Sequence, residues 1–299
     1  MMKLLGSASV ALGLMAAAAQ ASCIGVVTAG SGHNFWDSVI SGAEAAGEEL
    51  GIRVMARGPR EESSDAQLQI MNGFVDAGCV GIVLAPAGGA VEARVTELVA
   101  GGMPVVYVDR DGDGDRMAVF MTDNYQAGVA AGEAMAASLN DTGQVAVFRL
   151  DPEIVSTSDR ERGFLDAVQA AGLEVVHDVT LGQQIGDARQ TASNAMTSVE
   201  FDGVFTPNES SSVATQAALT STGKAGSIVH IGFDYHELFA EGLASGSMEG
   251  FMVQQPYAMG YQGVMAVSGI IEGNLPAQEM NAIAPAFVNA GNASAHLTN

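Results

Sequence analysis

Asp109 and Arg110 stand side by side directly after the apolar run Pro-Val-Val-Tyr-Val at 104–108. The β-branched and aromatic residues of this run are typical of a strand buried inside a parallel sheet. In open α/β sheets, ligands bind outside the carboxyl ends of the strands. A carboxylate accepts hydrogen bonds and a guanidinium donates them, which suits neighbouring hydroxyl groups. The pair therefore predicts a site for a sugar or a polyol.

A polar segment at 30–36 follows the first apolar run and contains His33, Asn34, Phe35 and Trp36. It resembles the dinucleotide motif G-x-G-x-x-G, but Phe35 stands in place of the third glycine, so we do not expect a nucleotide. Two rings in a polar loop at a strand end are better interpreted as a wall on which the C–H face of a sugar stacks. The alternative is that one or both rings plug the start of the following helix.

The acidic run at 109–114 matches the first six positions of an EF-hand loop. Position twelve is Phe120 instead of glutamate, and an apolar strand precedes the loop instead of a helix, so we do not expect calcium. Asp111, Asp113 and Asp115 are then interpreted as a solvated turn. No cluster of Cys or His has the spacing of a metal site, and no metal or cofactor is expected.

Polar residues also follow other expected elements. The Ser/Thr/Asp content at 156–159 is typical of a helix start, so Ser158 or Asp159 is expected to cap a helix over 160–171. Arg160 and Arg162 lie two positions apart and point to different sides of the first turn. At most one of them should face a cleft. Asn208 and Asp234 each follow a further apolar run, at 203–206 and 228–233.

A catalytic set does not accompany these groups. The five histidines are scattered, and neither G-x-S-x-G nor H-E-x-x-H occurs. We therefore expect a binding protein; an enzyme that works with carboxylates alone is the alternative.

Apolar runs and helix-period stretches alternate along the whole chain, which predicts parallel sheets covered by helices on both faces. There are enough repeats for two lobes of similar build, with several chain crossings between them that form a hinge. A final helix at about 256–272 and a terminal strand near 284–288 would complete the lobes. The other expected elements are 24–28, 35–50, 80–84, 88–101, 105–108, 125–138, 144–149, 160–171, 174–179, 187–198, 203–206, 210–222, 228–233 and 236–244.

Residues 1–21 have the features of a secretory signal peptide: one Lys, an apolar stretch and the triplet Ala19-Gln20-Ala21. Removing Lys3 with this leader leaves 11 basic residues against 34 acidic ones, a formal net charge of −23. Such a surface repels nucleic acid and anionic lipid, because phosphate contacts need clustered Lys and Arg. The apolar stretch is short and Ala-rich, so export in soluble form is favoured over a membrane anchor.

Cys23 and Cys79 are the two cysteines of the chain, and each opens an apolar run. In an exported protein they form either a disulfide or two small buried thiols. Lipidation of Cys23 is disfavoured because Gln20-Ala21-Ser22 lacks the leucine of lipoprotein signals.

Taken in order, these motifs resemble the periplasmic sugar-binding proteins of ABC transporters, of the ribose/galactose type within the periplasmic binding protein type I family. The likeness covers about 22–290, and these proteins are related to the effector lobes of lactose-repressor-like regulators. The motifs are IGVV with the aromatic pair, PVVYVDR at 104–110, TDN at 122–124, RERGF at 160–164, FTPNE at 205–209, IGFD at 231–234 and VQQPYAMG at 253–260.

The resemblance implies a set of ligand-binding side chains: Asp109, Arg110, Arg160, Asn208, Asp234 and Gln254, with Phe35 and Trp36 flanking the sugar ring. Where the family often has Asn followed by Pro, this chain has His33-Asn34, and either residue can be the one that reaches the ligand. The family fold also places the strands of Cys23 and Cys79 side by side, which favours the disulfide.

The same resemblance implies an α/β fold of two doubly wound parallel-sheet lobes, formed by 22–122 plus 255–283 and by 123–254 plus 284–299. We therefore expect a monomeric periplasmic receptor that closes on a monosaccharide or polyol and delivers it to an ABC permease. The alternatives are a chemoreceptor-coupled sugar sensor, a carbohydrate-active enzyme and a regulator's effector domain. The last is disfavoured because the leader takes the place of any helix-turn-helix head.

Overall fold

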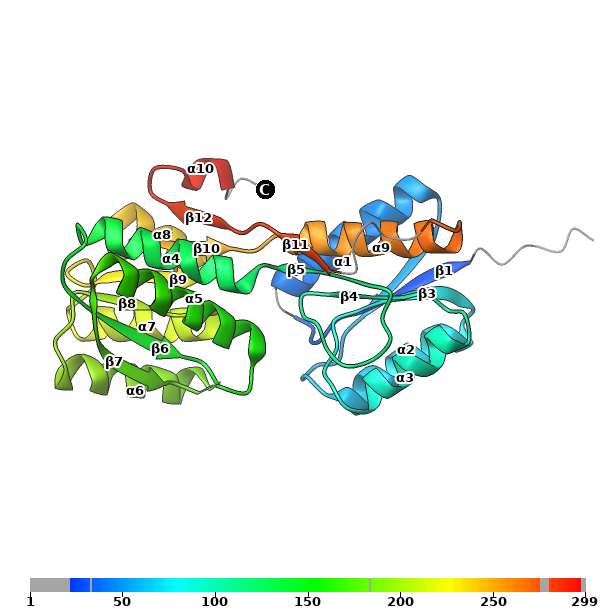
Figure 1. Ribbon diagram of the computed structural model, residues 1–299, viewed down its shortest axis with the longest axis horizontal. Coiled ribbons are helices and arrows are strands. Elements are labelled where there is room, and N and C mark those ends of the chain that lie inside the picture. Colours follow the sequence, from blue (N-terminus) through cyan, green and yellow to red (C-terminus); the bar gives the residue numbers. More distant parts are fainter. Residues whose placement is uncertain (1–21, 33, 183, 275–279, 297–299) are drawn as a thin grey trace, which may run out of the picture.

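The computed structural model describes residues 22–32, 34–182, 184–274 and 280–296, arranged as two α/β lobes side by side (Figure 1). Each lobe is a six-stranded sheet between layers of helices, which confirms the predicted fold class. The expected leader and His33 lie outside the described residues. Among the helices described, none is long and apolar enough to cross a membrane.

The first sheet has the strand order β11-β5-β4-β3-β1-β2, and all of its pairs are parallel. Ile24 and Val26 pack against helices on one face and Cys23 and Val27 against helices on the other, which is the two-residue alternation of a strand buried on both sides. Helices α1 (Asn34–Leu50) and α9 (Pro256–Ile271) cover the first face, and α2 (Ser64–Asp76) and α3 (Ala90–Ala100) cover the second. The strands are β1 (Cys23–Val27), β2 (Arg53–Arg57), β3 (Cys79–Leu84), β4 (Val105–Val108), β5 (Ala118–Thr122) and β11 (Met280–Ile283).

The second sheet repeats this order as β12-β10-β9-β8-β6-β7. Its last pair, β10 with β12, is antiparallel, so the expectation of purely parallel sheets is wrong at this edge. The strands are β6 (Gln144–Arg149), β7 (Glu174–Thr180), β8 (Gly203–Phe205), β9 (Val229–Phe233), β10 (Gly250–Val253) and β12 (Ala286–Asn289). The helices are α4 (Asn124–Ser138), α5 (Val155–Ala171), α6 (Ile185–Ser198), α7 (Glu209–Ser221), α8 (Glu237–Ser245) and the short α10 (Ala293–His296).

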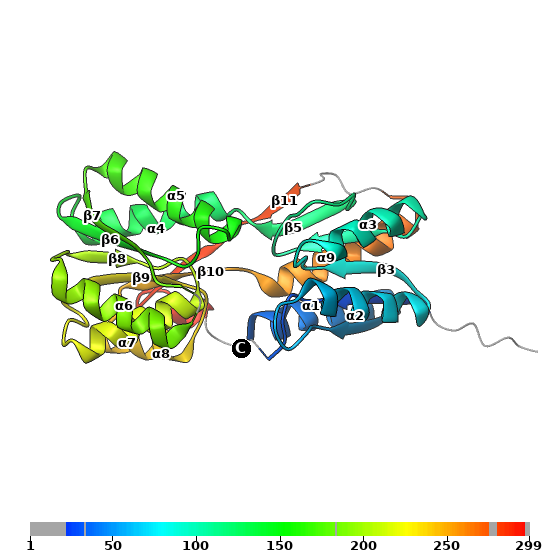
Figure 2. The ribbon, with the colours of Figure 1, turned by 90° about the horizontal axis from the view of Figure 1, so that it is seen from below.

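The chain passes between the lobes three times: from β5 to α4, from β10 to α9 and from β11 to β12 (Figures 1 and 2). Each of these connections leaves the carboxyl end of a strand, so the carboxyl ends of both sheets face the region between the lobes. The third connection enters the second sheet from that same edge. Strand β12 must therefore run against its neighbour, which explains the antiparallel pair.

Helix α5 begins at Val155, five residues before the expected start at 160. Its N-cap is Ile154, which makes no side-chain cap bond, so the expected capping by Ser158 or Asp159 is wrong. The Ser158 hydroxyl instead donates to the Pro152 carbonyl at 3.2 Å. Arg160 consequently lies in the second turn of the helix.

Glycines allow two helix pairs to approach closely, one pair in each lobe. A Cβ on Gly128 of α4 would lie 2.0 Å from the carbonyl oxygen of Arg160, and one on Gly163 of α5 would lie 2.1 Å from that of Tyr125. Gly42 of α1 and Gly260 of α9 make the equivalent approach in the first lobe. Both contacts leave no space for any larger residue.

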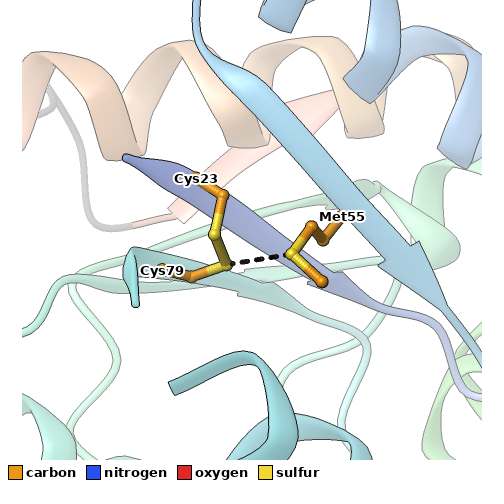
Figure 3. The surroundings of a disulfide bond; sticks show 3 residues. All are labelled: Cys23, Met55 and Cys79. Atoms are coloured by element: carbon orange, nitrogen blue, oxygen red, sulfur yellow. Dashed lines mark hydrogen bonds between the residues drawn. A yellow bond between two sulfur atoms is a disulfide. The ribbon is translucent and has the colours of Figure 1, made fainter. Parts of the chain in front are cut away.

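A disulfide joins Cys23 of β1 to Cys79 of β3 across the first sheet (Figure 3). The two Cα atoms are 4.3 Å apart and are register partners in the parallel pair. The Met55 sulfur lies 3.8 Å from that of Cys79, so a third sulfur packs against the bridge. The bridge joins residues that are 56 positions apart in the sequence. It lies at the amino ends of the strands, away from the carboxyl ends that face the other lobe.

Candidate ligand-binding site

Asp109 and Asp234 occupy equivalent places in the two lobes. They follow β4 and β9, which are the third strands from the β11 and β12 edges of their sheets. Both residues have a left-handed backbone, with φ of 69° and 66°. The Asp109 N–H donates to the Phe120 carbonyl at 2.9 Å and the Asp234 N–H donates to the Met252 carbonyl at 2.8 Å. Asp tolerates this conformation better than most residues, and each carboxylate lies at a strand end that faces the other lobe.

Arg110 is held between two carboxylates of its own lobe. Its Nε donates to Asp109 Oδ2 at 3.1 Å and its Nη1 donates to Glu62 Oε1 at 2.7 Å. Burial lowers the pKa of Arg110, but the charges of Asp109 and Glu62 outweigh this and raise it above the ordinary value. Asp109 and Arg110 thus form a fixed acceptor–donor pair with Glu62 as an outer support.

Arg160 is buried, with 4% of its surface exposed. Its Nε donates to Asn124 Oδ1 at 2.8 Å, its Nη1 donates to the Pro207 carbonyl at 2.9 Å, and its guanidinium lies 3.8 Å from the centre of the Phe233 ring. Burial lowers the pKa of Arg160, while the charges of Asp234 and Asp109 act in the opposite direction. Charged groups of both lobes therefore gather at one place.

Arg162 points elsewhere. Its side chain is 62% exposed and pairs with Asp159 at 2.9 Å. The two arginines thus point to different sides of α5, and the buried one is on the side of the carboxylates.

Asp234 is tied to the crossings between the lobes. Gln254, which follows β10, donates from Nε2 to Asp234 Oδ1 at 2.7 Å and accepts at Oε1 from the Thr122 hydroxyl at 2.8 Å. Burial raises the pKa of Asp234, and Arg160 and the Gln254 amide oppose that rise.

Asn208 acts as the N-cap of α7. Its Oδ1 accepts from the Ser211 N–H at 3.1 Å and its Nδ2 donates to the Ser210 hydroxyl at 3.0 Å. The Asn208 side chain is therefore committed to the helix start in this structure.

A hollow of about 410 Å³ lies between the lobes next to these groups. Four of the expected ligand-binding residues line it: Asn34, Phe35, Asp234 and Gln254. Sequence patterns did not indicate the other lining residues, which are Ser38, Glu209, Tyr235, Val253, Gln255, Pro256, Tyr257 and Ala295. Tyr235 and Tyr257 are the large exposed rings of this set, and their positions directly after Asp234 and within the motif VQQPYAMG were the available signals.

Phe35 and Trp36 have different surroundings. Both lie in the first turn of α1 instead of in a loop, and Trp36 meets the Phe35 ring edge-on at 4.8 Å between centroids. Both rings pack against the core of the first lobe; Phe35 also lines the hollow, and Trp36 lies beside Gly30. Of the two rings, Phe35 is therefore the one placed to contact a molecule in the hollow.

The acidic loop after Asp109 is held by its own ion pair. Arg116 donates to both carboxylate oxygens of Asp111, at 3.0 and 2.7 Å. The residues that the structure describes contain no group of three or more His, Cys, Asp or Glu side chains able to hold a metal ion.

A family model described as a periplasmic binding protein domain matches residues 24–275. The chain belongs to the periplasmic binding protein family. This membership agrees with a binding protein and not with an enzyme.

The chain is also similar to several sugar-binding proteins. A D-ribose/D-allose-binding protein of Pseudomonas aeruginosa is 22% identical over 272 residues, which cover 87% of this chain and 85% of that protein. The periplasmic component of an ABC-type sugar transport system from Hahella chejuensis is 27% identical, with a TM-score of 0.80 over 89% of this chain and 99% of that one. A carbohydrate transporter solute-binding protein from Agrobacterium radiobacter, in complex with D-arabinose, is 26% identical, with a TM-score of 0.82 over 92% and 97% of the two chains.

Proposed function

We propose that this chain is a periplasmic receptor for a monosaccharide or polyol, which it delivers to an ABC permease. The observation that carries the proposal is the gathering of Asp109 and Arg110 from the first lobe with Arg160 and Asp234 from the second. The charges of these two carboxylates and two guanidiniums cancel, and together they offer acceptors and donors that suit a ligand with many hydroxyl groups. The names of the relatives support the same class.

In this proposal Phe35, Tyr235 and Tyr257 supply apolar faces for the sugar ring, while Gln254 and either Asn34 or His33 supply further polar contacts. Trp36 and Asn208 act beside the site, as the plug and the helix cap that hold Phe35 and the α7 terminus. The two lobes, 22–122 plus 255–283 and 123–254 plus 284–299, rotate about the three crossings and close on the ligand. The protein acts as a monomer after residues 1–21 have been cleaved on export.

A sugar panel with D-ribose, D-allose, D-arabinose and common polyols tests this function. A ligand that binds only the folded state at 100 times its Kd adds about 2.7 kcal/mol of stability, which appears as a rise in Tm. Calorimetry then gives the affinity, and a smaller radius of gyration by X-ray scattering reports closure. A flat response across the whole panel would contradict the proposal.

A further inference from the structure

The first crossing carries two buried polar residues that do not line the hollow. Thr122 ends β5 and is fully buried, and Asn124 begins α4 with 3% of its surface exposed. Each holds one of the charged side chains of the second lobe, Thr122 through Gln254 and Asn124 directly.

The direction of the Thr122 bond follows from the chemistry of its neighbours. An ionised Asp234 can only accept, so the amide of Gln254 must turn its nitrogen toward it. The Gln254 oxygen then faces Thr122, whose hydroxyl donates to it. Without that hydroxyl, the Gln254 oxygen loses its donor, and only the bond to Asp234 is left to hold the amide in this orientation.

The bond to Arg160 likewise fixes the orientation of the Asn124 amide, but it leaves the amide nitrogen without a partner among the described residues. Its Oδ1 accepts from Arg160, and its Nδ2 is buried without a hydrogen-bond partner among the described residues. Such an unpaired donor is rare and unfavourable. Turning the amide over would place two donors, Nδ2 and the Arg160 Nε–H, against each other. The unpaired nitrogen is therefore the consequence of fixing Arg160.

We propose that Thr122 and Asn124 are positioning residues that couple the orientation of Asp234 and Arg160 to the first crossing between the lobes. This inference rests on the proposed function. The connection from β5 to α4 turns when the lobes close. The same connection also fixes the orientation of the acceptor Asp234 and the donor Arg160 in the second lobe. Ligand affinity then depends on two residues that the ligand does not touch.

Thr122→Val removes the hydroxyl and keeps the shape of the side chain. Measured by calorimetry with the sugar of the panel that wild-type binds best, we expect affinity to fall on the order of tenfold. Thr122→Ser should restore most of it. Thr215→Val is the matched control, because Thr215 is also fully buried and its hydroxyl has no partner among the described residues.

The pH dependence separates positioning from a general loss of structure. The Asp234 carboxylate faces Arg160, Gln254, Glu209 and Asp109. If Gln254 loses its orientation, Asp234 keeps a proton to higher pH, so the acid limb of binding should move upward in Thr122→Val. A purely structural effect would weaken binding equally at every pH.

The same shift can be measured without any ligand by following the carboxyl carbon of Asp234 by NMR. A raised pKa in ligand-free Thr122→Val, but not in Thr215→Val, supports the inference even if no sugar of the panel binds. Equal affinities and equal Asp234 titrations in wild-type and Thr122→Val would overturn it. Failure of wild-type to bind any sugar would instead contradict the proposed function.

Asn124→Leu and Asn124→Asp test the second support. The Asp variant keeps an acceptor for Arg160, whereas the Leu variant removes it. We expect a clear loss of affinity for Leu and a smaller change for Asp. Asn72→Asp is the control, because Asn72 accepts from Arg94 Nε at 3.0 Å in the same way on α2. Equal affinities for both Asn124 variants and wild-type would contradict this role.

Discussion

The guanidinium of Arg160 stacks on the ring of Phe233 at 3.8 Å, while its Nε and Nη1 are bound to Asn124 and Pro207. Stacking and planar donation are properties of a guanidinium that an ammonium group lacks. Arg160→Lys should therefore weaken sugar binding by about 1.5–3 kcal/mol, which is the worth of a charged hydrogen bond. Titration calorimetry measures the loss, and thermal unfolding separates it from any loss of stability.

Arg162→Lys is the control for this prediction, because the Arg162 side chain is 62% exposed. Its affinity should stay close to wild-type. A larger loss at Arg162 than at Arg160 would show that the opposite side of α5 meets the ligand.

Asp109→Asn should cost about 2–5 kcal/mol of binding free energy, because a charged acceptor is lost from a site that becomes desolvated on closure. Asn is preferable to Ala here, since it tolerates the left-handed backbone at φ 69°. Asp111→Asn is the matched control: Asp111 is also bound by a neighbouring arginine but belongs to the acidic turn. Equal losses in the two variants would favour an acidic-loop site, and rescue by calcium would favour a metal.

His230 should make the protein less stable at acidic pH. It is fully buried between the Thr206 hydroxyl at 3.0 Å and Gln216 Oε1 at 2.8 Å, and burial lowers its pKa to about 3. Below the ordinary pKa of 6.5 the unfolded chain binds a proton that the folded chain refuses. The histidine therefore lowers the free energy of unfolding by up to about 1.4 kcal/mol per pH unit as the pH falls from 6.5 toward 3.

Denaturant unfolding of wild-type and His230→Gln at pH 7.5 and pH 5 isolates this effect, because other groups titrate equally in both proteins. The stability of wild-type relative to the variant should fall at pH 5. The ring signals of His230 in wild-type provide an independent check, and a shift near pH 6 would rule the effect out.

Gly163→Ala should destabilise the second lobe, because the added Cβ would lie 2.1 Å from the carbonyl oxygen of Tyr125. Forcing two packed helices apart should lower the free energy of unfolding by about 1–3 kcal/mol, as overpacking of a protein core does. Gly73→Ala in α2 is the control, since no atom lies within 4 Å of its added Cβ. That helical substitution should stabilise the protein by about 0.5–1 kcal/mol. Thermal and denaturant unfolding of both variants measure the difference, and a neutral Gly163→Ala would show that α4 and α5 are not packed so closely.

Much of the fold could be predicted because buried parallel strands have continuous apolar sequences, such as the runs before Asp109 and Asp234. Strand β2 was missed since its edge position leaves Arg53 and Arg57 exposed at the two ends of a short run. The start of α5 was misplaced because Ile154 caps it without a side-chain bond, so the Ser and Asp residues further along gave a false signal. The helix α2 and the strands β5, β10 and β11 were not predicted either.

The site could be predicted only in part, because local sequence patterns indicate strand ends but not contacts between distant residues. Strand ends indicated Asp109 and Asp234, because each follows directly on an apolar run. The bond between Thr122 and Gln254 joins residues 132 positions apart, and no local pattern indicates such a partner. The hollow that Phe35 lines is likewise formed with residues such as Asp234 and Tyr257, which lie far away in the sequence.

The first lobe receives α9 and β11 only after strands β6 to β10 of the second lobe have been synthesised. Until then, α1 has no partner for its closest helix contact and β5 is an open sheet edge, since Met280 pairs with Val119 from the far end of the chain. Such distant pairings form slowly, and unfinished chains with exposed apolar faces and free edges aggregate easily. The order of the elements therefore leaves the amino-terminal lobe incomplete until nearly the whole chain has been made, although it is the first to be started.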